Sequence, residues 1–458
     1  MAKRLSSAAL LLAAALPSPI PALAQTAPQT QATLDVLRAE IAAMRAEQAR
    51  HMAEMRDANA RIAALEARSA SSPSTATAAA TNSPAFPTQA TAVVSGTPDR
   101  VAPATLAATD ATPRPDPLRG LDVGGDIRVR YEGNFGERNV IDRTRGVIRA
   151  RLRAGYAIND WLSVGGQLVT GDADDPNSSD LSISNFADDL DFSLDQAYLQ
   201  AKTGELTVLA GKFPNLVERT ELVWDGDVNP QGVAASYRIP LGAQSSLKAN
   251  GLFFVIDERS GGRDSAMVGG QLAWTTRPGD TLQFGLAGAY YDYHLNSLAG
   301  GDAGDFRSNL LAPGGVAYLS DFNLIDGVAS ATYSGFGEQW PVQLVADYVK
   351  NLGAATRADT GYSGAITVGR AARRGDWRFG YTHMSVETDA VFAAFSHDNL
   401  NLATNYLLHG LSGDYVVFDK IILNATYYHY RVKDPAGPGG GIPGDWRDRL
   451  RLNLLVNF

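Results

Sequence analysis

Apolar and polar side chains alternate along most of the chain, from about residue 121 to its end, in segments of roughly ten residues, the length of a tilted membrane strand. The final segment shows this clearly, because Leu450, Leu452 and Leu454 alternate with Arg449 and Arg451. A period of two gives a strand one apolar and one polar face. Turn residues separate the segments, and the pattern predicts about sixteen strands.

The connections between these segments alternate between short and long. Short turns recur at every second connection, for example at Asn159 and Thr203, whereas residues 171–191 and 296–320 form long polar loops. This asymmetry is typical of outer-membrane barrels, whereas a soluble β-sandwich more often has short loops at both ends. We therefore expect an all-β transmembrane fold, an antiparallel outer-membrane β-barrel of about 16 strands over residues 119–458. An even strand count places both ends of the barrel in the periplasm.

Residues 33–67 follow a different period. Leu34 and Ile41 fall on one core position of a heptad, and Leu37 and Met44 fall on the other, in a register sustained over the whole segment. Such a repeat predicts an α-helical coiled coil, which needs partner helices to bury its apolar seam. On the expected topology this coiled coil lies in the periplasm.

Gln48 and His51 form two adjacent polar layers in this seam. A polar layer fixes the register and the number of helices at some cost in stability. We interpret the helix as a self-association element, with a homotrimer as the expected assembly. The alternative is a single amphipathic helix lying on another surface, and a hydrated His51 layer fits the pattern better than His51 as a metal ligand.

Two other segments precede the barrel. Residues 1–24 have the features of a secretory signal peptide, because Lys3 and Arg4 precede an apolar run that is followed by small residues up to Ala24. The run is shorter than the ~18 apolar residues of a membrane-spanning helix. Residues 68–118 are rich in Ala, Ser, Thr and Pro without an apolar period, which predicts a disordered linker.

Charge and composition narrow the function classes. The formal charge of −9 becomes −9 − 2 = −11 once Lys3 and Arg4 are removed, which argues against a nucleic-acid partner. The chain has no cysteine, which excludes thiolate metal sites and cysteine nucleophiles. It has no G-x-S-x-G or H-E-x-x-H motif, and His409 and Ser412 lie on opposite strand faces. We expect no enzymatic activity, no metal and no cofactor.

Arginines on the first, second and last strands are the first candidate site. Each alternates with an apolar or small residue, and an arginine on the lipid face costs about 2–4 kcal/mol near the bilayer midplane. They should therefore face the lumen, and barrel closure makes the three strands neighbours. The predicted pore-lining basic strip consists of Arg128, Arg130, Arg149, Arg151, Arg153, Arg449 and Arg451. It would attract anions; alternatively, the guanidiniums pair with wall carboxylates and brace the barrel.

Residues 195–199, 211–215 and 222–233 carry a family resemblance. Their sequences, DQAYL, GKFPN and LVWDGDVNPQGV, look like those of the proteobacterial putative-porin family, which is in turn similar to the phosphate-selective porins O and P. The resemblance covers residues 121–458 and implies passive transport and trimerisation. The chain shows no lysine cluster of the kind that a phosphate-selective pore would suggest, so phosphate selectivity is not carried over.

The third outer connection is the second candidate site. In sixteen-stranded porins the corresponding loop folds into the lumen and constricts it. Here its acidic residues would face the arginine strip and create a transverse field at the narrowest point, unless it is an ordinary surface loop. The predicted constriction residues are Lys212, Arg219, Glu221, Trp224, Asp225 and Asp227.

The second outer connection is also acidic. Because runs of like charge are usually solvated, we interpret it as a surface loop, with divalent-cation binding as a weaker hypothesis. Its acidic residues are Asp172, Asp174, Asp175, Asp180, Asp188 and Asp189.

Together these patterns predict an outer-membrane porin for passive diffusion of small hydrophilic solutes and ions. The expected partners are two further copies of the chain, outer-membrane lipid and lipopolysaccharide, and the barrel assembly machinery, for which the terminal aromatic Phe458 would be the signal. Two alternatives stay open. One is an anchor that tethers the membrane to peptidoglycan through the coiled coil, and the other is a substrate-specific channel.

Overall fold

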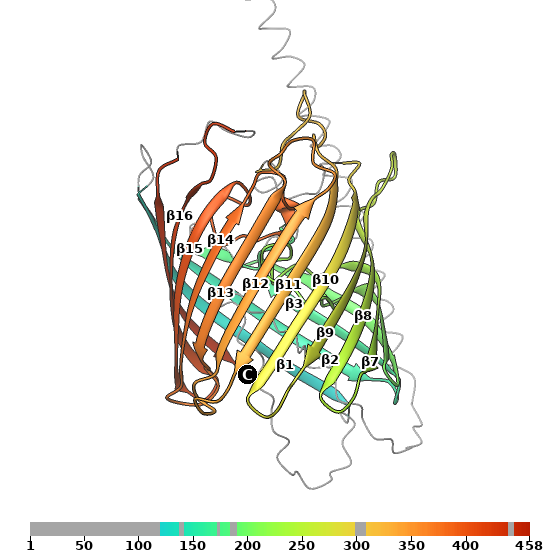
Figure 1. Ribbon diagram of the computed structural model, residues 1–458, viewed down its shortest axis with the longest axis vertical. Coiled ribbons are helices and arrows are strands. Elements are labelled where there is room, and N and C mark those ends of the chain that lie inside the picture. The colour runs from blue at the N-terminus through green and yellow to red at the C-terminus, as the bar shows by residue number, and fades with distance from the viewer. Residues whose placement is uncertain (1–119, 137–141, 172–174, 184–189, 298–307, 438–443) are drawn as a thin grey trace, which may run out of the picture. The chain divides into compact units, whose positions relative to one another are not determined.

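The computed structural model describes residues 120–136, 142–171, 175–183, 190–297, 308–437 and 444–458. The predicted signal peptide, coiled coil with Gln48 and His51, and linker lie outside these residues. Among the described residues, no helix is long and apolar enough to cross a membrane. They form one antiparallel sheet that closes into a barrel (Figure 1).

Within the described residues the sheet contains seventeen strands. They are β1 (Leu121–Phe135), β2 (Arg143–Ala157), β3 (Leu162–Thr170), β4 (Leu181–Ile183), β5 (Phe192–Thr203), β6 (Leu206–Lys212), β7 (Gln231–Pro240), β8 (Ser245–Asp257), β9 (Ser265–Thr276), β10 (Leu282–His294), β11 (Phe322–Tyr333), β12 (Val342–Asn351), β13 (Thr360–Gly369), β14 (Trp377–Val386), β15 (Tyr406–Phe418), β16 (Ile421–Val432) and β17 (Arg447–Asn457). One short 3-10 helix, η2 (Ala393–Phe395), lies between β14 and β15.

The barrel has sixteen strand positions because β3 and β4 share one. β3 pairs with β2 from Arg151 onward, and β4 pairs with β2 around Val147, so 17 − 1 = 16 positions remain. The first and last positions meet where Asp126 of β1 lies opposite Asn457 of β17, and this pairing closes the sheet. The predicted antiparallel barrel of about 16 strands is confirmed.

The two ends of the barrel differ, as the sequence predicted. Two residues join β5 to β6, and two join β15 to β16. Gly204 and Lys420 adopt φ angles of 56° and 69° in these turns, because a two-residue hairpin turn needs a left-handed backbone. At the other end, residues 213–230 and 387–405 form long loops. Figure 1 shows the short turns at the lower end and the long loops at the upper end.

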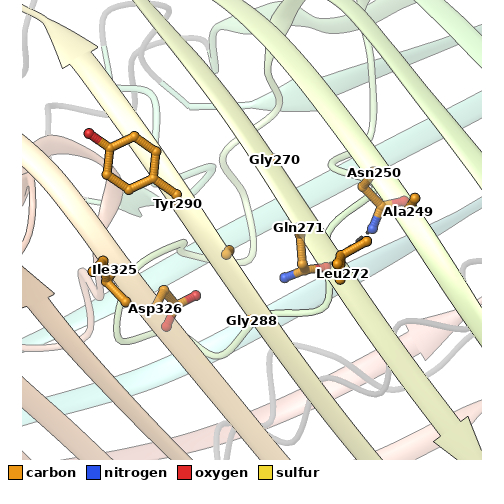
Figure 2. A pocket seen from close by; sticks show the side chains of 10 residues that line it. Ala249, Asn250, Gly270, Gln271, Leu272, Gly288, Tyr290, Ile325 and Asp326 are labelled. Atoms are coloured by element: carbon orange, nitrogen blue, oxygen red, sulfur yellow. Dashed lines mark hydrogen bonds between the residues drawn. The ribbon is translucent and has the colours of Figure 1, made fainter.

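The outer surface of the barrel is apolar and the inner surface is largely polar. On β1, Ile127 and Val129 are 43% and 46% exposed, whereas Arg128 between them is 3% exposed. A shallow hollow of about 600 Å³ lies in the barrel wall at Gly270 of β9 and Gly288 of β10. Its lining includes the exposed side chains of Leu272 and Tyr290 (Figure 2). An apolar exterior of this kind is what a barrel presents to lipid.

Candidate functional site: an arginine strip and three inward-folded loops

The arginine strip, made of the seven arginines predicted above, lies on the inner face of β1, β2 and β17. Arg128 is directly opposite Arg149 on β2, and Glu132 of β1 is directly opposite Arg451 on β17. These three arginines are at most 4% exposed, whereas Arg153, the member nearest the short turns, is exposed. The register therefore brings arginines of three strands onto one inner wall.

Two carboxylates on β1 pair with this wall. Asp126 lies 2.8 Å from Nε of Arg151 and 3.1 Å from Nη2 of Arg149. Glu132 accepts a hydrogen bond of 2.7 Å from Nε of Arg451. Because a buried charge without a partner is strongly destabilising, these pairs hold β1 to both of its neighbours. The bracing role considered from the sequence is thus consistent with these contacts.

A third carboxylate reaches the strip from L2, the connection between β3 and β5 (residues 171–191, described in part). Asp180 forms ion pairs with Arg128 and, at 2.6 Å, with Nη1 of Arg130. Burial alone would raise the pKa of the Asp180 carboxyl, but the two guanidiniums hold it well below its usual range. Asp180 is therefore ionised near neutral pH and neutralises part of the strip.

A fourth carboxylate comes from L3, the connection between β6 and β7 (residues 213–230). Asp227 lies 3.3 Å from Nη1 of Arg151 and accepts a hydrogen bond of 2.9 Å from the Ser179 hydroxyl of L2. Burial would raise the pKa of the Asp227 carboxyl, but Arg151 and Arg149 hold it below its usual range. L2 and L3 therefore meet at the arginine strip.

Glycines at both ends of L3 allow the loop to turn inward. Gly211 has φ +115° and Gly232 has φ +147°, values that other residues rarely adopt. A Cβ atom on Gly211 would lie 2.3 Å from the backbone oxygen of Ala197, and one on Gly232 would lie 2.3 Å from that of Phe253. Lys212 follows Gly211, ends β6 and lies opposite Gln231. These glycines belong to two of the sequence segments that carry the family resemblance.

The middle of L3 packs against the inner wall through Trp224. Its ring is fully buried and lies 5.5 Å from that of Tyr291 and 6.3 Å from those of Phe254 and Tyr293, measured between centroids. A buried aromatic cluster of this size resists displacement, because removing a tryptophan from a core costs about 3–5 kcal/mol. L3 is therefore held inside the barrel and is not a surface loop.

Polar contacts hold L3 on either side of this cluster. Thr220 donates a hydrogen bond to Asp347 of β12, and Glu218 pairs with Lys248 of β8 at 3.0 Å. Arg219 turns back on its own loop and donates to the backbone oxygen of Gly226 at 3.2 Å. L3 thus extends across the lumen from its base at β6 and β7 to the wall at β12.

A second loop, L7 (residues 387–405, between β14 and β15), also lies inside the barrel. Its apolar residues from Ala390 to Phe395 are at most 5% exposed, and the Phe395 ring stacks 5.8 Å from that of Trp224. Asn309 fastens L7 from another outer loop by donating to the backbone oxygens of Thr388 and Val391, each at 2.9 Å. The sequence analysis did not identify L7, whose apolar run VFAAF is the signal that could have pointed to it.

L3 and L7 bind each other through backbone hydrogen bonds. The Asp225 amide donates to the Phe395 carbonyl oxygen at 2.7 Å, and the His397 amide donates to that of Glu221 at 3.0 Å. On its other side, L7 reaches the arginine strip, because Arg449 donates to the backbone oxygen of Asn399 at 2.7 Å. L7 therefore bridges L3 and the strip.

Titratable groups gather at the L3–L7 contact. Burial raises the pKa of the Asp225 carboxyl well above its usual range, and the neighbouring carboxyls of Asp398 and Glu221 raise it further. Burial, with Arg451 and Arg449 nearby, lowers the pKa of the His397 imidazole to about 3. The imidazole is therefore neutral near pH 7, and its approach of 3.7 Å to Glu221 is not an ion pair.

Known proteins resemble this chain in sequence over part of its length and in fold. Residues 136–298 match the family described as "Putative porin", and none of the curated proteins compared with the chain matches it. The high-pH structure of Pseudomonas putida OprB is similar, with 15% identity, a TM-score of 0.50, and 74% of this chain and 94% of that chain covered. An anion-selective porin from Comamonas acidovorans shows 14% identity and a TM-score of 0.45, covering 74% of this chain and 99% of that one.

The chain has the fold of an outer-membrane porin.

Within this porin fold, the three acidic residues of the predicted constriction have different contacts. Asp227 contacts the arginine strip, whereas Glu221 and Asp225 turn toward L7. The side chain of Asn399 in L7 donates to Glu221 at 3.3 Å and accepts a hydrogen bond from Arg451, so this amide links the Glu221 carboxylate to the strip. Asp180, interpreted from the sequence as part of a solvated loop, contacts the strip directly.

Proposed function

We propose that the chain is an outer-membrane porin through which small hydrophilic solutes and ions diffuse passively. The observation that carries this proposal is the contrast between the two faces of the closed barrel, apolar outside and lined with arginines inside. A protein with a lipid-compatible exterior and a charged interior is suited to conduct polar solutes across a membrane. The match of residues 136–298 to the Putative porin family supports the same function.

The charge on the inner wall favours anions. The seven arginines of the strip lie together on one wall, and among the described residues the carboxylates of Asp126, Glu132, Asp180 and Asp227 pair with them. A surplus of one sign inside a narrow, low-dielectric passage raises the local concentration of the opposite ion. We infer that L2, L3 and L7 form the constriction and that the strip makes it weakly anion-selective.

Three copies of the chain form the assembly in this proposal. The support is the predicted heptad seam of residues 33–67, with polar layers at Gln48 and His51, together with the resemblance to trimeric porins. The coiled coil extends into the periplasm, and Phe458 serves as the signal to the barrel assembly machinery. Chemical cross-linking of the purified protein should give a ladder that ends at three chains.

Liposome swelling tests the proposal most simply. Proteoliposomes that hold the purified protein should swell in small neutral solutes such as arabinose, and the rate should fall as solute size rises, because diffusion through a constriction excludes by size. Empty liposomes are the control for leakage. The rate for a small anion should exceed that for a cation of the same size.

A second candidate function is a membrane anchor whose barrel does not conduct. The observation that favours it is the dense packing of L3 against L7, where Trp224 and Ala390 are fully buried inside the barrel. Proteoliposomes that swell no faster than empty ones would contradict the porin proposal and favour the anchor. Binding of the chain to isolated peptidoglycan would then be the next measurement.

A further inference from the structure

Four ionisable side chains form one row across the outer ends of β14, β15, β16 and β17. His383 lies directly opposite His409, His409 opposite His429, and His429 opposite Asp448. The rings of His383 and His409 are 4.7 Å apart between centroids. Half of the chain's six histidines therefore gather in this histidine row.

The histidine row faces outward, away from the lumen. A residue adjacent to each histidine in the sequence, Met384, Leu408 or Tyr428, is at most 3% exposed and belongs to the core inside the barrel. Alternation then directs the histidines to the outer surface, where the His429 side chain is 38% exposed. Ionisable groups are costly on a lipid-facing surface, so a row of them requires a polar partner.

The row lies near the ends of the four strands that carry the long loops. His383 precedes the outer end of β14 by three residues, and His429 precedes that of β16 by three. At about 3.3 Å per residue the row is roughly 10 Å from these ends, measured along the strands. The assignment of this end to the outer leaflet rests on the porin orientation proposed above.

Aromatic residues and one arginine surround the histidines. Trp446 stacks on His429 with 4.2 Å between centroids, and the Arg431 guanidinium lies 5.2 Å from the Trp446 ring centre. Tyr381 and His409 share a hydrogen bond of 2.9 Å. Tyrosine and tryptophan are typical of the membrane interface, whereas three adjacent imidazoles and a guanidinium add nitrogen hydrogen-bonding groups to it.

Each histidine uses Nδ1 to fix its ring. Nδ1 of His383 bonds to the backbone oxygen of Leu408 at 3.0 Å, and Nδ1 of His429 bonds to Asp448 at 2.7 Å. An anion close to an imidazole favours the protonated form, in which Nε2 is also a donor. The fixed rings therefore leave Nε2 as the atom that each histidine offers to a ligand.

The surface between the row and the short turns is apolar. Phe379, Leu411, Leu423 and Leu452, on the same four strands, are 45% to 54% exposed. A ligand that satisfies both parts of this face is an amphiphile with an anionic head and hydrocarbon chains. We propose that the histidine row, together with Arg431, binds the phosphate of an outer-leaflet lipid whose acyl chains lie on this apolar surface.

Native mass spectrometry of the purified full-length protein in detergent tests the proposal, with phosphatidic acid as the anionic probe and phosphatidylcholine, a zwitterion without net charge, as the comparison. The wild-type protein should retain phosphatidic acid in preference to phosphatidylcholine. Replacing all three histidines (His383→Gln, His409→Gln and His429→Gln) should weaken phosphatidic acid binding about tenfold or more, because charge-assisted hydrogen bonds are lost. Arg431→Gln alone should weaken it less.

His294→Gln is the matched control. His294 also lies near the outer end of its strand, β10, with 63% of its side chain exposed, and it approaches Asp292 at 3.5 Å. This variant should bind phosphatidic acid as the wild type does. Liposome swelling should be the same in all variants, so that a failure of the lipid site is distinguishable from a failure of the porin function.

Three results would overturn the proposal. The first is equal binding of phosphatidic acid by the triple-histidine variant and the wild type. The second is inorganic phosphate that binds as tightly as the lipid, because the acyl chains would then contribute nothing. The third is efficient disulfide linkage between copies carrying Leu411→Cys, a clean reporter in a chain without cysteine, because the surface would then be covered by a second copy.

Discussion

At the scale of single residues, the inner wall is defined by which carboxylate meets which arginine. Asp180 and Asp227 come from different loops, yet both end on the arginine strip, where Ser179 joins the two loops. Each carboxylate removes positive charge from the passage and at the same time fixes its loop. Selectivity and loop position are therefore coupled through the same side chains.

Removing one of these carboxylates should shift ion selectivity toward anions. Asp180→Asn removes the carboxylate that Arg128 and Arg130 share, so the net charge at the strip becomes more positive by one. The reversal potential in a salt gradient should move toward the anion equilibrium potential. The same substitution should also destabilise the folded protein, by about 3–5 kcal/mol if the guanidiniums stay buried.

Glu338→Gln is the control for this measurement. Glu338 lies in a short turn, and its side chain is 78% exposed, so its charge is screened from the passage. Its reversal potential should equal that of the wild type. An unchanged reversal potential in Asp180→Asn would mean that ions do not pass close to the arginine strip.

At the scale of elements, the interior is built by two loops that hold each other. L3 supplies Trp224 and L7 supplies Phe395, and backbone hydrogen bonds join the two loops beside these rings. The inward path of L3 was expected from its place as the third outer connection, by analogy with sixteen-stranded porins. The inward path of L7 was not, because a loop of its length has no path fixed by its own sequence, and the apolar run 390–395 finds its partners only in the folded barrel.

Truncation of Trp224 should release L3 from the wall. Trp224→Ala removes the ring that contacts Tyr291, Phe254 and Phe395, at a cost of about 3–5 kcal/mol to the packing. Single-channel conductance should rise and become noisier, because L3 then moves within the lumen. Trp161→Ala, a change at an exposed tryptophan in a short turn, should leave the conductance unchanged. A Trp224→Ala channel with wild-type conductance would show that L3 does not restrict the passage.

The L3–L7 contact should respond to pH in two opposite ways. Because the pKa of Asp225 is raised, its stabilisation of the L3–L7 contact is complete below about pH 4 and is lost as the pH rises through the raised pKa. The lowered pKa of His397 means that its contribution is complete above about pH 6.5 and is lost as the pH falls toward about 3. The two effects oppose each other in weakly acidic solution.

Substitutions should separate these effects. In the double variant Asp225→Asn/Asp398→Asn, which also removes the second buried carboxyl with a raised pKa, the histidine effect remains, so acidification from pH 7 to 4 should loosen L7 and raise the conductance. In His397→Gln only the carboxyl effect remains, so the same acidification should tighten the contact and lower the conductance. Parallel pH profiles for both variants and the wild type would exclude the L3–L7 contact as a determinant of conductance.

At the scale of the whole molecule, the barrel was predictable because its rule is local. On β1, alternation with a period of two directs Ile127 to the outer face and Arg128 to the inner face. The other strands follow the same rule, and its repetition over sixteen strand positions specifies a closed sheet. The inward direction of the arginines follows from the same rule. The partners of the arginines do not, because Asp180 lies 50 positions or more from Arg128 and Arg130 along the chain and meets them only after closure.

The most direct test of the central claim is the single-channel conductance of the purified protein in a planar bilayer, first in symmetric salt and then across a salt gradient. The porin function predicts discrete conductance steps in groups of three and a reversal potential that shows a preference for anions. Bilayers that stay silent while the protein is demonstrably folded and inserted would contradict it.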